Sequence, residues 1–171
     1  MATGWQRDKL WSDKYMDEVK QILGLHLIKA ASIEEDQQRN TDLIVLKMDG
    51  VRVGVRIRDN GYYKQYGGQF TIRAGRPSGL KTELTKIIEG WGDYFFYGHA
   101  NYGGRLLAWG LGDLSAFRLW FNRSLAKMDS GEVPGVSKEN KDNSSDFLAF
   151  DWHEVDGFLI ASHNLPERNT P

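Results

Sequence analysis

The chain has 171 residues, of which 40% are hydrophobic and 26% charged, and its formal net charge is −1. This composition excludes a wholly disordered chain, and the balance of charge excludes a uniformly basic nucleic-acid coat. The absence of cysteine removes disulfides, thiol nucleophiles and cysteine-based metal sites. No apolar run approaches the roughly 18 residues of a membrane span, and the first residues lack a signal-peptide core, so we expect a soluble, cytoplasmic protein.

The length favours a single domain, which we place at residues 1–163. Residues 129–146 are rich in Ser, Gly, Asn, Lys and Asp, and we expect a flexible acidic loop there. The last residues, 164–171, are expected to form a disordered tail.

Helical spacing of apolar residues predicts a first helix over residues 13–29, with Asp13 as its N-cap. An apolar run then predicts a strand over residues 42–48. Asp49-Gly50 follows and is typical of a tight hairpin turn. Residues 51–58 alternate apolar and polar side chains, which predicts a second strand paired with the first.

Residues 62–66 form a tyrosine-rich segment between glycines, which we interpret as a loop, and residues 69–73 predict a third strand. The later elements are expected to be helices at 80–91 and 114–125, the latter capped by Asp113, and strands at 94–97, 105–111, 147–151 and 158–161. The order predicts an α/β fold whose mixed sheet contains an antiparallel three-strand meander flanked by helices.

Charge is distributed unevenly along the chain. Residues 51–90 contain eight basic and three acidic side chains, whereas residues 129–156 contain eight acidic side chains and two lysines. A nearly neutral chain can therefore still present one basic face.

Common catalytic motifs are missing from the sequence. It has no P-loop, no dinucleotide-binding glycine motif, no HExxH and no nucleophile elbow. The four histidines lie far apart in the sequence, and their spacing predicts no metal site.

The most informative region begins with Asp42 at the start of a predicted strand. In the next strand Arg56 and Arg58 fall on one face, because successive side chains alternate. This arrangement resembles the PD-(D/E)XK nuclease superfamily, in which an Asp begins one strand of a hairpin and (D/E)-x-K ends the next. The resemblance implies a restriction-endonuclease-like core and a Mg²⁺-dependent reaction on DNA.

The sequence departs from that motif at two positions. Arg56 occupies the place of the second carboxylate, and Arg58 occupies the place of the lysine. Two carboxylates normally hold the Mg²⁺ that activates water in such enzymes. An arginine can stabilise charge on a phosphate but cannot act as a base, because it stays protonated.

Another acid would therefore have to complete the site. Glu83, close to Lys81 at the start of the predicted second helix, is our first candidate, and Glu18 on the first helix is the reserve. The resemblance thus implies Asp42 and Glu83 as metal ligands and Lys81 and Arg58 as groups that stabilise phosphate charge.

A wider set of basic, hydroxyl and aromatic residues is expected to contact nucleic acid: Arg52, Arg56, Arg73, Arg76, Ser78, Tyr62, Tyr63 and Lys64. Each candidate has a structural alternative. Asp42 can cap a loop, the strand arginines can form a solvated face, and the tyrosines can pack beneath a loop. Acids such as Glu83 are also common in the first turn of a helix without any function.

Three functions remain open from the sequence. The first is a metal-dependent DNA nuclease, and the second is a non-catalytic nucleic-acid-binding module on the same fold. The third is a small phage-type protein that acts by protein interaction or inhibition. The expected partner is nucleic acid, DNA before RNA, with no membrane; a homodimer remains open.

Overall fold

The computed structural model describes residues 4–30, 43–45, 50–75, 79–140 and 145–166. Its helices are α1 (Gly4–Asp13), α2 (Met16–Leu27), the turn η1 (Asn60–Tyr62), α4 (Tyr63–Tyr66), α5 (Glu83–Ile88) and α6 (Leu114–Leu125). Its strands are β1 (Ile28–Ala30), β2 (Leu43–Val45), β3 (Val53–Arg58), β4 (Gln69–Gly75), β5 (Tyr94–Ala100), β6 (Leu106–Asp113), β7 (Val136–Glu139), β8 (Asp146–Asp151) and β9 (Leu159–His163).

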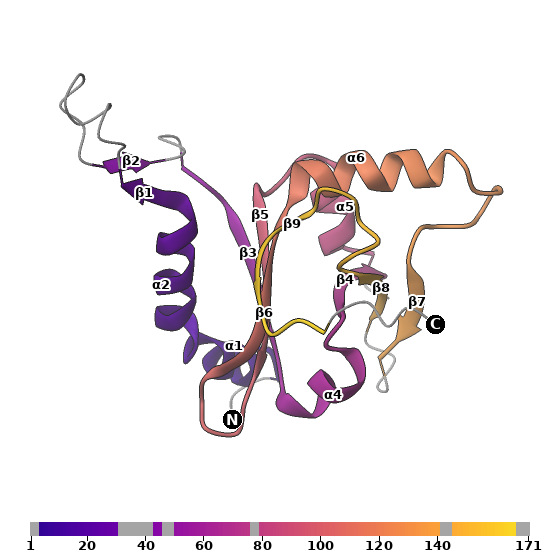
Figure 1. The fold of residues 1–171 in the computed structure, drawn as a ribbon. Coiled ribbons are helices and arrows are strands. Elements are labelled where there is room, and N and C mark those ends of the chain that lie inside the picture. Colours follow the sequence, from indigo (N-terminus) through magenta and orange to yellow (C-terminus); the bar gives the residue numbers. More distant parts are fainter. Residues whose placement is uncertain (1–3, 31–42, 46–49, 76–78, 141–144, 167–171) are drawn as a thin grey trace, which may run out of the picture.

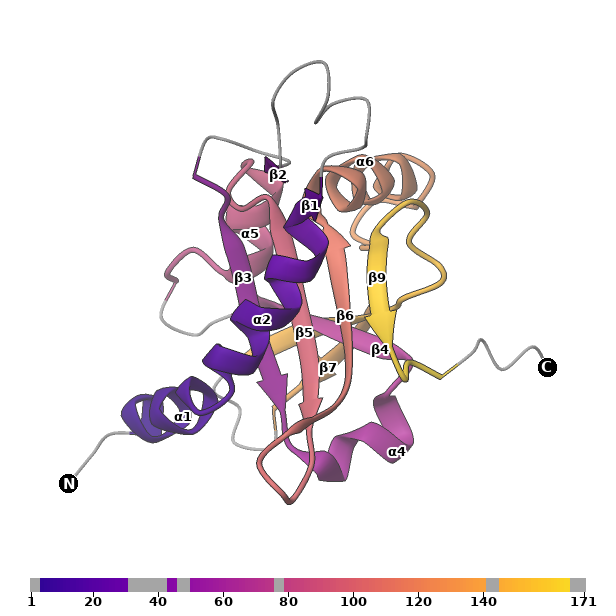
Figure 2. The same cartoon turned by 60° about the vertical axis from the view of Figure 1, so that its left-hand side comes forward.

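The main sheet has four strands in the order β3-β5-β6-β9. β3 and β5 are parallel, whereas β5–β6 and β6–β9 are antiparallel, so the sheet is mixed. Helix α2 lies across one face of this sheet, and the other sheet with α5 and α6 lies on the opposite side (Figures 1 and 2). No helix among the described residues is long and apolar enough to cross a bilayer.

The face of the main sheet that α2 covers is apolar. Ile57 of β3 and Phe96 of β5 pack there with Val19 of α2, which is 1% exposed. Val53 and Val55 join the same cluster because alternate residues of β3 share a face. Burial of these side chains stabilises the packing of α2 against the sheet. The alternate residues of β3, Arg56 and Arg58, therefore lie on the opposite face.

The second sheet has three antiparallel strands in the order β4-β8-β7. Its two faces differ completely. We call one the aromatic face, formed by Phe70, Ile72, Leu148 and Phe150, all of which are buried. We call the other the cavity face, formed by Gln69, Thr71, Arg73, Lys138, Phe147 and Ala149, all of which line one hollow.

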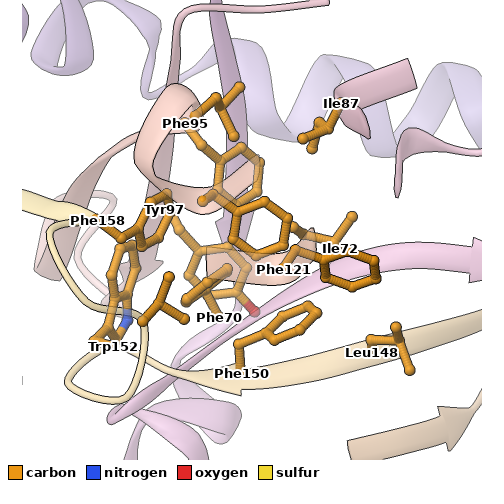
Figure 3. Packing of buried hydrophobic residues seen from close by; sticks show 13 residues of the cluster. Phe70, Ile72, Ile87, Phe95, Tyr97, Phe121, Leu148, Phe150, Trp152 and Phe158 are labelled. Carbon is orange, nitrogen blue, oxygen red and sulfur yellow. The ribbon is translucent and has the colours of Figure 1, made fainter. Parts of the chain in front are cut away.

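The aromatic face supplies much of the hydrophobic core (Figure 3). Phe70 is fully buried, and its ring centroid lies 4.6 Å from that of Trp152 and 4.7 Å from that of Phe158. Gly112 of β6 allows the Phe158 ring to pack against the main sheet, since a Cβ there would lie 2.1 Å from Phe158 Cζ. The core therefore depends on a glycine in the strand beneath it.

Many expected elements are present, and the mixed α/β class is confirmed. The strands expected at 69–73, 94–97, 105–111, 147–151 and 158–161 correspond to β4, β5, β6, β8 and β9. Helix α6 begins after Asp113, as expected, and Asp113 Oδ1 accepts a hydrogen bond from the Ser115 amide at 2.7 Å.

The expected three-strand meander is wrong. β2 pairs with β1, β3 lies parallel to β5, and β4 pairs with β8, so the three strands belong to three different sheets. Asp49 lies outside the described residues, but the strands on either side of Asp49-Gly50 do not pair. Alternation predicts which side chains share a face; it does not specify the neighbouring strand.

Four boundaries also differ from expectation. The helix expected at 13–29 is the shorter α2, which β1 follows at Ile28; α1 before it was not predicted, and Asp13 ends α1 instead of capping α2. Residues 62–66 are helical, and the helix expected at 80–91 is the shorter α5, capped by Thr82. The segment 129–146, expected as a loop, contains β7, because a partner strand can order polar residues with no hydrophobic pattern.

Candidate functional site

Two adjoining hollows open beside the edge strand β3, the smaller one against the cavity face of the three-stranded sheet and the larger one against α1. One has a volume of about 620 Å³ and the other about 900 Å³. They share the following lining residues: Asp8, Arg58, Tyr62, Arg73, Asn140 and Phe147. Because the lining is shared, the two hollows form one continuous groove, which we call the arginine groove.

The arginine groove is organised around the hydroxyl of Thr71. Arg56 Nη1 donates to Thr71 Oγ1 at 3.3 Å and to the Thr71 carbonyl at 3.1 Å. Arg58 Nη2 donates to the same hydroxyl at 2.9 Å, and Arg58 Nε donates to Tyr97 Oη at 3.1 Å. Thr71 Oγ1 and Tyr97 Oη lie 3.2 Å apart. Strands β3, β4 and β5 thus each contribute to one polar network.

This network contains more donors than acceptors. Thr71 Oγ1 accepts from both arginines, so its own hydrogen points to Tyr97 Oη. Tyr97 Oη then accepts from Arg58 and Thr71, and its hydrogen has no acceptor among the described residues. A guanidinium has five N–H donors, and Arg58 uses two of them here. The groove is therefore prepared for a ligand rich in acceptors.

Glu83 is the acid within this network. Its Oε2 accepts from Arg56 Nη2 at 2.5 Å and from the Arg73 amide at 3.0 Å. Burial lowers the pKa of the Arg56 guanidinium, Glu83 opposes that change, and the charges of Arg58 and Arg73 lower the pKa further. Glu83 thus favours the charged form of Arg56, while Arg58 and Arg73 disfavour it.

Aromatic rings border the charged centre. The ring centroid of Tyr62 lies 5.7 Å from Arg58 Cζ, and that of Phe147 lies 5.9 Å from the same atom. Tyr66 lies beside Tyr62, with 6.4 Å between their ring centroids, and both tyrosines are exposed. The groove thus combines cationic groups with flat apolar surfaces.

His99 borders the same hollow from β5, where it is paired in register with Arg58. Its side chain is 1% exposed, and neither ring nitrogen has a hydrogen-bond partner among the described residues. Burial, aided by the Arg58 charge, lowers the pKa of His99 to about 4. The ring is therefore neutral at pH 7 and has one donor and one acceptor.

Several of the residues predicted from the sequence do meet in this groove. Arg56, Arg58 and Arg73 line it, Glu83 reaches Arg56 from the first turn of α5, and Tyr62 lies at its border. These residues come from four separate elements, so their proximity is a product of the fold.

Other predicted residues lie elsewhere. Lys81 Nζ forms an exposed ion pair with Glu89 at 2.6 Å. Glu18 accepts from the Leu106 amide at 3.1 Å and lies on α2, across the main sheet from Glu83 (Figure 1). Arg52 and Lys64 are exposed and do not line the groove.

Tyr63 has a structural role. Its hydroxyl donates to the Asn164 carbonyl at 2.6 Å, and its ring packs edge-on against His99 with 5.6 Å between centroids. It therefore covers His99 and ties α4 to the end of β9.

Asp42, Arg76 and Ser78 lie outside the described residues, so the structure places none of them. Within the described part of the chain, no three His, Asp or Glu side chains cluster closely enough to hold a metal ion. Glu83 is paired with Arg56 and has no second acid beside it in the described residues, so a Mg²⁺ site here would need Asp42, which the structure does not place.

Sequence reasoning missed Thr71, Tyr97, His99 and Phe147. The signal for Thr71 was available, because it shares a face with Arg73 in a strand that was predicted correctly. No signal could place Tyr97 and His99 beside Arg58, because that contact requires the parallel pairing of β3 with β5.

Comparison with known proteins gave no match: no family model, no curated protein and no solved structure matches this chain.

Proposed function

We propose that this protein binds single-stranded nucleic acid, DNA in the first place, in the arginine groove and without a metal ion. The observation that carries the proposal is the donor excess around Thr71 and Tyr97, where two guanidinium groups have N–H groups to spare. Phosphate oxygens are acceptors only, so a phosphodiester supplies what this network lacks.

The surroundings of the arginines favour a single strand. Tyr62, Tyr66 and Phe147 present rings along the groove, and bases of a single strand can stack on such rings. The carboxylates of Asp8 and Glu139 also border it, so positive charge is concentrated at the arginines and not spread over the face. We therefore expect few phosphate contacts and a modest dependence of affinity on salt.

The experiment measures binding of a fluorescein-labelled single-stranded DNA by anisotropy over a range of salt concentrations. Arg58→Met should weaken binding about tenfold and reduce the salt slope by about one, because it removes one phosphate contact. Arg123→Met is the matched control, since Arg123 is exposed on α6 and does not line the groove. Equal affinities of Arg58→Met and the wild type would contradict the proposal.

A nuclease is the second candidate, supported by the position of Glu83. Its carboxylate lies beside Arg56, where the motif would have an acid, and on the same side of β3 as Arg58. The first metal ligand of that hypothesis is Asp42, which the structure does not describe. Mg²⁺-dependent cleavage of plasmid or branched DNA, lost in Asp42→Ala, would favour this candidate over the binding module.

A further inference from the structure

His99 is a buried polar side chain that the phosphate-binding network does not use. Both of its ring nitrogens are without partners among the described residues, although buried polar groups are usually hydrogen-bonded. Leaving such a group unpaired costs free energy, so a ligand that pairs with it would recover that cost. The ring borders the 620 Å³ hollow, which is of a size typical for small-molecule pockets.

We propose that the hollow beside His99 receives one base of the bound strand, whose hydrogen-bonding edge pairs with the His99 imidazole. This inference rests on the proposed function and adds a base-reading pocket to it. The pocket lies next to the phosphate site, because His99 and Arg58 are directly paired neighbours on β5 and β3. Neighbouring strands are only about 4.8 Å apart, so one nucleotide can reach both groups.

The chemistry of the hollow suits a base better than a second phosphate. A neutral imidazole has an acceptor nitrogen, which repels phosphate oxygens but matches an N–H of a base. Gln69 borders the same hollow, and its side-chain amide offers donors and an acceptor. The free hydroxyl hydrogen of Tyr97 adds another donor. Base edges present donors and acceptors side by side, as these three groups do together.

Aromatic rings complete the pocket. Tyr63 and Tyr97 contact His99 edge-on, at 5.6 Å and 5.5 Å between ring centroids. Of these two tyrosines Tyr97 lines the hollow beside His99, whereas Tyr63 does not line it and is held on the other side by its bond to Asn164.

The test compares two labelled DNA strands of about 20 nucleotides, one with bases and one in which every base is replaced by an abasic tetrahydrofuran. We expect His99→Leu to bind the base-bearing strand about tenfold more weakly than the wild type and the abasic strand equally well. His163→Leu, on the exposed end of β9, is the matched control and should change neither affinity.

The outcomes separate this inference from the proposed function. A wild-type protein that binds neither strand overturns both. A wild-type protein that binds DNA, with His99→Leu unchanged on both strands, overturns the base pocket and leaves the binding function in place.

A second measurement needs no variant. The ring nitrogens of His99 can be observed by ¹⁵N NMR in the wild-type protein, where a new hydrogen bond shifts their resonances. The base-bearing strand should shift them and the abasic strand should not. Unchanged resonances at saturating base-bearing DNA would overturn the pocket.

Discussion

The aromatic face and the cavity face of the three-stranded sheet use the same strands for opposite purposes. On β4, Phe70 and Ile72 are fully buried, whereas the intervening Thr71 and Arg73 open onto the arginine groove. On β8, Phe150 is buried in the aromatic face, whereas Phe147 lines the arginine groove. Because successive side chains of a strand point to opposite faces, neighbouring residues differ in role: one is buried in the core and stabilises the fold, and the next lines the groove.

The two faces also differ in how many of their side chains have packing or hydrogen-bond partners. The aromatic face is filled by rings at 4.6 to 6.2 Å from Phe70. The cavity face leaves donors on Arg58 and Tyr97 and both nitrogens of His99 without partners in the described structure. We infer that stability resides mainly in the first face and binding in the second.

The largest expected effect is on the aromatic face. Phe70→Ala should lower the free energy of unfolding by about 3–5 kcal/mol, because it removes a fully buried ring and leaves a cavity. Phe147→Ala, on the opposite face and partly exposed, should cost about 1 kcal/mol or less. Urea unfolding of the two variants measures both values, and equal losses would contradict the division between the faces.

His99 predicts a stability that depends on pH. In the folded protein its pKa is about 4, whereas an unfolded histidine titrates near 6.5. Above pH 6.5 neither state binds the proton, so His99 has no effect on stability there. As the pH falls below 6.5, the unfolded state is protonated first, and the free energy of unfolding should decrease by about 3 kcal/mol by pH 4.

Comparison with His99→Leu isolates this effect, because carboxylates also titrate at acid pH in both proteins. Between pH 6.5 and 4 the free energy of unfolding of the variant should lack the decrease that comes from His99. At neutral pH the variant should be at least as stable as the wild type, since no hydrogen bond is lost. Parallel stability curves for the two proteins, measured by urea unfolding at each pH, would rule out a buried neutral His99.

Local patterns were sufficient to predict much of the fold. Asp113 and the apolar face of α6 predicted both ends of that helix correctly. The predicted ends of β4, β5 and β8 differ from the observed ends by at most three residues. Strand pairing was not predictable in this way. The Asp-Gly signal favoured a local hairpin, but β3 buries Ile57 and Val55 beneath α2 only as a parallel neighbour of β5.

The site was predictable to the same extent. The shared face of Arg56 and Arg58 follows from alternation within one strand and is confirmed by their common bond to Thr71. The pairing of Glu83 with Arg56 joins residues 27 positions apart, and that of Arg58 with Tyr97 joins residues 39 apart. Such contacts follow from the packing of separate elements, which local sequence patterns do not record.

A smaller effect on stability is expected from Glu83, the acid that pairs with Arg56 beside the arginine groove. Glu83→Gln should lower the free energy of unfolding by about 1–2 kcal/mol, because the Arg56 guanidinium loses its ion pair while the amide oxygen can still accept from the Arg73 backbone. The cost is below that of a fully buried pair, since the two side chains are 20% and 30% exposed.

The same substitution should act in the opposite direction on binding. Removal of the carboxylate that pairs with Arg56 raises the local positive potential, so the affinity for single-stranded DNA should increase a few fold. Glu89→Gln is the matched control: it breaks the exposed pair with Lys81, and we expect it to change stability by about 0.5 kcal/mol or less and leave binding unchanged. A Glu83→Gln variant that loses both stability and affinity would instead mean that Glu83 positions Arg56 for the ligand. The Glu83 carboxylate would then be required for binding of DNA.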